Sequence, residues 1–294
     1  MDNYTENLHP VENETKVGQM FVYPLKGAQG IPVSELILIN GELQNDRIFS
    51  IAREDKNRLG ELHIVNSRNI PQISSLHVRP AEDGFCISSD RLNETIYLSY
   101  PTVGNIGEYR YTNARIKDHN GLVSLPFEHY NEWLGEALGM NGLHIVIPHD
   151  NWRRQYDPRY QFADARGRIA FSDNTPIHII SEDDLALFGQ EDTIDLQIFR
   201  PNLTISGASL ADYFSEGLDD LVQIRYCRID NSQYRIAPCQ RCVVINQNPK
   251  TGEKEYNNLK LLSSYKVSFG CYLLPTDGSP ISTKIDSNSR IELF

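Results

Sequence analysis

The chain has 294 residues, of which 40% are hydrophobic and 23% are charged, and its formal net charge is −11. This length permits one large domain or two ordinary ones, with a sizeable buried core. The negative charge disfavours nonspecific binding to nucleic acid, and no stretch approaches the roughly 18 to 20 consecutive apolar residues of a transmembrane helix, so we expect no nucleic-acid partner and no membrane span.

Residues 1–15 are acidic and polar, and they lack the basic start and apolar stretch of a secretory signal. We expect a disordered arm there. From residue 16 onward, short apolar segments alternate with turn-forming Gly, Pro, Asn and Asp, which is typical of β-strands. The segments of the first half are QMFVYPL (19–25), SELILI (34–39), RIFSIA (47–52), SSLHVRP (74–80), FCIS (85–88) and TIYLSY (95–100).

Two helices interrupt this pattern. The first is predicted over residues 126–139, where Pro126 suits the first turn and Gly139 suits the end. Its apolar residues share one helical face and read as core: Phe127, Tyr130, Trp133, Leu134 and Leu138. The second is predicted to begin at Ser181 as N-cap, with Asp184 three residues on as a weak capping box.

Strand-like segments resume after the first helix. They are LHIVIP (143–148), NLTIS (202–206), VQIRYCRI (222–229), CVVINQ (242–247), YKVSFGCYLL (265–274) and SRIELF (289–294). Strands this short and frequent indicate β-barrels or sandwiches rather than a parallel α/β sheet. We therefore predict a mainly β fold with a few helices, divided at the first helix into residues 16–138 and 139–294.

Five cysteines are present, and only Cys239 and Cys242 are close in sequence. The odd count argues for a reducing, cytoplasmic setting rather than a disulfide framework. For the pair itself, a zinc site is disfavoured because a structural site needs about four ligands and all eight histidines lie far upstream. A redox dithiol is disfavoured because such a pair normally begins a helix, whereas the following VVIN favours a strand.

A third interpretation is that one thiolate binds a soft or redox-active metal whose other ligands come from a cofactor. Such a cofactor would need anion-binding groups to hold it. Basic residues do follow or precede several predicted strands, although each one alone can be a solvated surface charge or part of a loop salt bridge. They are Lys26 in YPLKG, Arg47 in NDRIFSI, Arg200 beside Asn202 in FRPNLTISG, and Arg241 between the two cysteines.

Five motifs, YPLKG, DRIFSI, FSDNTPIHIISEDDL, FRPNLTISG and PCQRCVVINQNPKTGE, occur in this order between about residue 16 and the end of the chain. Together they resemble the MOSC proteins that carry an N-terminal MOSC β-barrel domain, the group that includes the mitochondrial amidoxime-reducing component and its bacterial relatives. The resemblance implies an N-terminal β-barrel domain over residues 16–138 followed by a MOSC domain over residues 139–294.

The resemblance also implies a site for the molybdenum cofactor. In that family the second cysteine of the pair is the molybdenum ligand, here Cys242. Asp173 would lie near the metal as a proton relay, or else be an ordinary turn residue. The matching cofactor-binding positions are Lys26, Arg47, Asn174, Thr175, Arg200, Asn202, Gln240 and Arg241.

The activity implied is reduction of N-hydroxylated or N-oxide small molecules, with electrons from a separate redox partner protein. The alternative is a cofactor carrier or sulfur-transfer module without its own substrate. Two positions depart from the family pattern: Gly27, where relatives often have serine, and Gln240, which replaces a small polar residue. Residues 151–168 contain five arginines, which we interpret as a solvated, mobile loop or as a positive rim of the site.

Overall fold

We describe a computed structural model of the chain, in residues 14–55, 58–101, 109–149, 152–165, 167–188, 194–214, 225–265, 269–277 and 279–294. The predicted disordered arm lies outside the described residues except for its last two positions, and Arg166 lies outside them as well. The fold is mainly β with a few short helices, which confirms the predicted class. Within the described chain, no helix is both long enough and apolar enough to cross a membrane.

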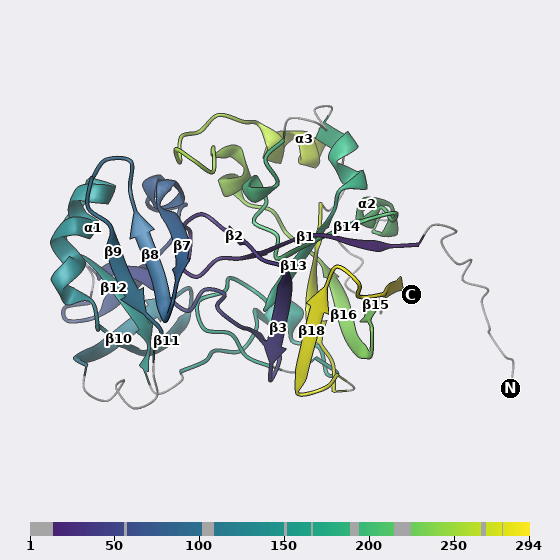
Figure 1. The fold of residues 1–294 in the computed structure, drawn as a ribbon, viewed down its shortest axis with the longest axis horizontal. Helices are drawn as coiled ribbons and strands as arrows, with labels where there is room; N and C mark the ends of the chain where they lie inside the picture. Colours follow the sequence, from purple (N-terminus) through teal and green to yellow (C-terminus); the bar gives the residue numbers. More distant parts are fainter. Residues whose placement is uncertain are drawn as a thin grey trace, which may run out of the picture.

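One half of the molecule is built around a closed five-stranded barrel (Figure 1). Its strands, in spatial order, are β10 (Tyr111–Ile116), β11 (His119–Ser124), β12 (Leu143–Pro148), β5 (Ser50–Glu54) and β6 (Leu62–Val65). Small and branched side chains such as Ala52, Ile64 and Val146 fill the barrel. The same cluster includes Phe171, which comes from the C-terminal half and is fully buried. This aromatic ring therefore anchors the segment around residue 171 to the barrel.

The other half is an eight-stranded sheet (Figure 1). Its spatial order is β19 (Ile291–Leu293), β15 (Tyr226–Ile229), β16 (Ser232–Pro238), β17 (Cys271–Pro275), β13 (Ile177–Ser181), β14 (Leu203–Ser206), β1 (Lys16–Val22) and β2 (Ile31–Pro32). Neighbouring strands are antiparallel except for the parallel pair β13 and β14.

Two three-stranded sheets complete the fold. The first comprises β18 (Ser282–Asp286), β3 (Glu35–Ile39) and β4 (Glu42–Leu43), and the second comprises β7 (His77–Ala81), β8 (Gly84–Ser88) and β9 (Ile96–Ser99). The predicted boundary after residue 138 stays a prediction, but strands cross it in both directions. β12 completes the barrel, and β1 pairs with β14, with Lys16 opposite Ser206. The two halves are thus joined by shared sheets.

The helices are short. They are η1 (Pro71–Ser75), η3 (Glu128–Tyr130), α1 (Asn131–Leu138), η5 (Pro158–Tyr160), η6 (Asp183–Phe188), η7 (Leu196–Ile198), α2 (Leu210–Tyr213), η9 (Val243–Asn246) and α3 (Asn258–Tyr265). The helix predicted at 126–139 is confirmed as η3 followed by α1. It ends at Gly139, whose φ of 67° is left-handed, and it buries Trp133, Leu134 and Leu138.

Two local predictions were wrong. Ser181 is not a helix N-cap but the last residue of β13, and its hydroxyl donates to Ala208 O at 2.6 Å. The helix that follows is the 3₁₀ segment η6. Asp184 instead accepts from the first backbone amides of α2, Leu210 N at 3.1 Å and Ala211 N at 3.0 Å, while Ser209 is the N-cap of that helix.

The segment CVVINQ is also not a strand. It forms η9, in which Ile245 alone is buried while Val243 is 48% exposed. This apolar segment buries only one side chain and needs no neighbouring strand to do so. Its high β-propensity therefore led to the wrong prediction. Cys242 is the N-cap residue of η9.

Candidate functional site

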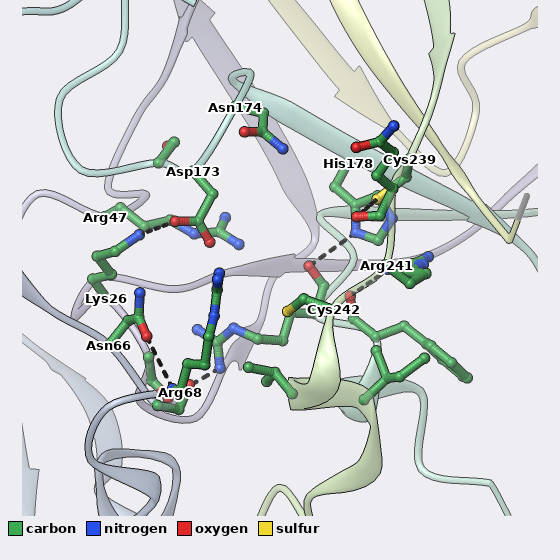
Figure 2. A pocket seen from close by; sticks show the side chains of 18 of the residues that line it. Lys26, Arg47, Asn66, Arg68, Asp173, Asn174, His178, Cys239, Arg241 and Cys242 are labelled. Carbon is green, nitrogen blue, oxygen red and sulfur yellow. Dashed lines mark hydrogen bonds and ion pairs between the residues drawn. The ribbon is translucent and has the colours of Figure 1, made fainter. Parts of the chain in front are cut away.

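A cleft lies where the two halves meet, and both halves contribute its walls. Its empty space, including the open mouth, is about 850 Å³. Every site residue predicted from the sequence lines it: Lys26, Arg47, Asp173, Asn174, Thr175, Arg200, Asn202, Gln240, Arg241 and Cys242. Figure 2 shows Lys26, Arg47 and Asp173 on one side of this cleft and Arg241 and the two cysteines on the other.

Lys26 and Asp173 form an ion pair on one side of the cleft. Lys26 follows β1, is 4% exposed, and donates from Nζ to Asp173 Oδ1 at 2.6 Å and to Phe171 O at 2.8 Å. Burial lowers the pKa of Lys26 to about 8, although Asp173 acts to raise it. Partial enclosure raises the pKa of Asp173, but the Lys26 ammonium outweighs this effect and holds it well below its usual value. Asp173 is therefore ionised at neutral pH.

The loop that carries Asp173 is held in place by hydrogen bonds from two basic side chains, Arg154 and Lys117. Arg154, which is 3% exposed, donates to Asp173 O at 2.8 Å and to Ala170 O at 3.3 Å. Lys117 donates to Asp173 O at 3.0 Å and to Asn174 Oδ1 at 2.7 Å. Together with Phe171 in the barrel core, these contacts fix the position of the carboxylate relative to the barrel.

The Arg47 side chain is held in place by Asp46, from the same half of the molecule, and by Asn202. Its guanidinium pairs with Asp46, and its Nη1 donates to Asn202 Oδ1 at 3.3 Å. Asn202 is 1% exposed; its amide also donates to Phe21 O and to Asp46 Oδ1, and its Oδ1 accepts from His178 N. All four hydrogen-bonding positions of the Asn202 amide are therefore used within the protein. We infer that Asn202 orients the Arg47 side chain rather than binding a ligand.

Arg200 lies over the same aromatic ring as Arg47. Its Cζ is 4.3 Å from the centroid of Tyr23, and that of Arg47 is 4.5 Å from it. Arg200 donates from Nη1 to Ala28 O at 2.7 Å and to Gly27 O at 3.2 Å. Burial, followed by the nearby Arg47 charge, lowers the pKa of Arg200 to about 10. Both arginines have left-handed backbones, with φ of 51° at Arg47 and 55° at Arg200, a conformation that is costly outside glycine and often found at functional sites.

The two cysteines differ in their surroundings. Cys239 is 5% exposed, and burial raises the pKa of its thiol. Cys242 is half-buried and lines the cleft at the start of η9. Figure 2 shows the Cys242 sulfur directed toward the middle of the cleft, whereas the Cys239 sulfur lies beside His178. All five cysteines are unpaired. Both cysteines line the cleft, and Cys242 is the more exposed of the two.

The remaining predicted residues have varied partners. Asn174 donates to the Tyr272 hydroxyl at 2.9 Å, and Thr175 donates to Ile177 O at 3.2 Å. Gln240 is exposed and accepts from Arg159, which also pairs with Asp157 at 3.0 Å. In the arginine-rich segment, Arg153 pairs with Glu42 and Arg154 is buried, so the expectation of a solvated loop was wrong for these two.

Sequence reasoning missed several polar residues of the cleft, among them Asn66, Ser67, Arg68, His178 and Tyr272. Asn66 accepts from Arg68 N at 2.9 Å, which shapes the turn after β6. The tripeptide Asn-Ser-Arg a few residues before Pro71 was the available signal for that turn. Nothing in the sequence distinguished His178 or Tyr272 from ordinary residues of buried strands.

Polar atoms of the cleft that lack a hydrogen-bond partner indicate which kind of ligand it can bind. Within the described chain, Arg200 Nη2 and Arg241 Nη2 are buried without a hydrogen-bond partner, and the exposed Arg68 side chain makes no hydrogen bond or ion pair. None of these three guanidiniums has a carboxylate partner in that part of the chain. Buried donors without partners are rare in folded proteins, so the cleft is suited to a multiply charged anion such as a phosphate. The described residues contain no group of three or more His, Cys, Asp or Glu side chains that could hold a metal.

Comparison with known proteins supports this picture. Residues 166–288, which include the thiol pair, Arg200 and Asp173, match the model of the MOSC domain. The chain contains a MOSC domain at residues 166–288. It is 26% identical over 264 residues to mitochondrial amidoxime-reducing component 1 of Homo sapiens, covering 85% of this chain and 72% of the relative.

Similar matches include the Mus musculus protein of the same name, at 24% identity with 85% of this chain and 71% of the relative covered. Mitochondrial amidoxime reducing component 2 of Rattus norvegicus is 23% identical, with 85% and 72% covered. These matches confirm the resemblance inferred from the five motifs. The roles assigned to individual residues of the cleft stay predictions.

Proposed function

We propose that this MOSC-domain protein binds a molybdenum cofactor in the cleft and reduces N-hydroxylated or N-oxide small molecules with electrons from a separate donor protein. The observation that carries the proposal is the set of guanidinium nitrogens without a hydrogen-bond partner, Arg200 Nη2 and Arg241 Nη2, in the cleft that Cys242 lines. The names of the similar proteins supply the reaction class, amidoxime reduction. A phosphate-bearing cofactor that needs one thiolate fits both features.

The residues divide into three tasks. Arg200, Arg241 and Arg68 supply free guanidinium donors for an anion. Arg47 and Lys26 add positive charge from the barrel half, and each is partly neutralised by its own carboxylate, Asp46 or Asp173. Cys242 would provide the thiolate that tunes the metal.

When bound, the cofactor would supply a metal centre able to pass two electrons to a substrate. The chain's own contribution to proton supply is the pair of Lys26 and Asp173. Because Asp173 is ionised and Lys26 has a pKa of about 8, the proton of this pair resides on Lys26 Nζ at neutral pH. The Lys26 ammonium donates to Asp173 Oδ1, and this hydrogen bond keeps the proton in the lining of the cleft.

The proposal is tested with protein made in a host that synthesises the cofactor. We expect about one molybdenum and one pterin per chain, and reduction of benzamidoxime to benzamidine by a reduced viologen, which makes the natural electron donor unnecessary. Loading without turnover would favour the carrier or sulfur-transfer alternative. Absence of both metal and pterin from folded protein would overturn the proposal.

A further inference from the structure

His178 lies in β13 at the inner wall of the cleft, where it is 7% exposed. Its backbone is fixed on both sides, because it stands opposite Tyr272 in the register with β17 and exchanges hydrogen bonds with Asn202. Figure 2 shows its ring between the Cys239 sulfur and the Arg241 side chain. The position of the imidazole is therefore set by two neighbouring segments of the sheet.

One hydrogen bond decides which ring nitrogen carries the proton. Nδ1 lies 3.2 Å from Arg200 O, and a carbonyl oxygen can only accept, so Nδ1 is the protonated nitrogen. Burial, and after it the charge of Arg241, lowers the pKa of His178 well below its ordinary value, so the ring is neutral. In a neutral ring protonated at Nδ1, Nε2 has a free lone pair.

This lone pair has no partner. Nε2 is buried and makes no hydrogen bond to any described residue. The other unpaired buried atoms of the cleft, Arg200 Nη2 and Arg241 Nη2, are donors. His178 therefore adds an acceptor to a site whose other buried, unpaired atoms are donors, and a buried acceptor left unpaired calls for an explanation.

We propose that His178 Nε2 accepts a hydrogen bond from a ring N–H of the bound cofactor, and so makes the cleft selective for a ligand that combines an anionic group with a heterocyclic N–H donor. This inference rests on the proposed function. The cofactor is the better candidate than the substrate because His178 lies on the buried wall and is bonded to the carbonyl of Arg200, one of the anion-binding residues. The exposed residues Arg68 and Gln240 lie instead at the mouth.

His178 has two separable roles: its Nδ1–H positions Arg200, and its Nε2 binds the ligand. Asparagine places an amide where Nδ1 was and nothing where Nε2 was, whereas glutamine places a carbonyl oxygen near the Nε2 position. We expect His178→Asn to release pterin and molybdenum about 2- to 10-fold faster than the wild type during dialysis, as for loss of one neutral hydrogen bond. His178→Gln keeps an acceptor near the Nε2 position but lacks the Nδ1 donor to Arg200 O, and we expect it to release them more slowly than His178→Asn.

The matched control is His144→Asn. His144 is also a strand histidine bonded through Nδ1, here to Asn131 at 3.0 Å, but it lies in the barrel strand β12 and does not line the cleft. It should release cofactor at the wild-type rate. Equal release from folded His178→Asn and wild type, or equally fast release from the Asn and Gln variants, would overturn the inference. A wild type without any cofactor would instead overturn the proposed function.

A measurement on the unmutated protein keeps the inference testable if the variants do not fold. With ¹⁵N-labelled histidine, His178 should give one protonated nitrogen, Nδ1, and one bare nitrogen, Nε2, in the cofactor-free protein. Loading should shift the Nε2 resonance in the direction of hydrogen-bond acceptance. A proton on Nε2 in the cofactor-free protein, or an Nε2 resonance that loading leaves unchanged, would overturn the inference.

Discussion

Lys26 and Asp173, 147 positions apart in the sequence, meet in an ion pair of 2.6 Å that joins the barrel half to the loop before β13. Lys26 is almost completely buried, while the Asp173 side chain is 55% exposed. Water therefore screens the carboxylate, and the burial of the ammonium dominates the electrostatics of the pair. The pKa of Lys26 falls from 10.5 to about 8 as a result.

This shift predicts how stability depends on pH. Between about pH 8 and 10.5 the folded protein binds fewer protons at Lys26 than the unfolded chain does. The contribution of Lys26 to stability therefore rises with pH through that window and is lost as the pH falls through 8. The unfolding free energy of wild type relative to Lys26→Met, from urea titrations, should increase from pH 8 to pH 10.

The control for this experiment is Lys284→Met, since Lys284 is exposed and its pKa is raised by hydrogen bonds to Asp286 and Glu35. Its difference from wild type should not rise with pH over the same range. A difference between wild type and Lys26→Met that stays constant from pH 8 to 10 would show that Lys26 titrates normally.

Removal of Arg200 should weaken cofactor binding without unfolding the protein. A guanidinium contact to phosphate is charge-assisted and worth roughly 1.5 to 3 kcal/mol, so Arg200→Ala should lower retention by about one to two decades. Pterin and molybdenum are measured after dialysis. Arg228→Ala, at an exposed arginine paired with Glu292, should retain the cofactor. Full retention in Arg200→Ala would count against its assignment.

Gly27, where the family resemblance implies that serine is common, has a backbone conformation that favours glycine. Its φ is +90°, and a Cβ at this position would lie 2.8 Å from Ile73 Cγ2. Gly27→Ser should therefore lower the unfolding free energy by about 1 to 2 kcal/mol for the backbone alone, with the contact to Ile73 adding to that cost.

Gly60→Ser separates these two effects. Gly60 has a similar φ of +83°, and nothing lies within 4 Å of its would-be Cβ. It should show only the backbone cost. Equal destabilisation of the two variants in urea unfolding would mean that Ile73 yields to the added side chain and that Gly27 is retained for its conformation alone.

The sequence allowed the fold class and the membership of the cleft to be predicted, because strand length and turn residues are local signals and the motifs carry the basic residues. It did not predict that Asn202 is saturated by Asp46, Arg47 and two backbone groups, since that depends on contacts between distant segments. His178 was missed for the same reason. In a buried strand its sequence context is that of a core residue, and only the hydrogen bond to Arg200 O reveals its free nitrogen.

The two cysteines should respond differently to substitution. Both cysteines line the cleft, but Cys239 is 5% exposed and burial raises the pKa of its thiol, so Cys242 is the better placed of the two to act as a thiolate ligand. Cys242→Ser should abolish reduction of an N-hydroxylated substrate, because a hard hydroxyl is a poor substitute for a soft thiolate at molybdenum.

Cys239→Ser should keep most of the activity, because a small, weakly polar side chain is replaced by one of nearly equal size. A zinc site or a redox dithiol would use both sulfurs together, and it predicts comparable losses in the two variants. Activity is measured with a reduced viologen as electron source, and cofactor content is measured in the same samples. Because Cys239 is buried, its variant is compared per folded molecule, with far-UV circular dichroism as the measure of folding. Equal loss of activity in the two folded variants would rule out a single-thiolate molybdenum site.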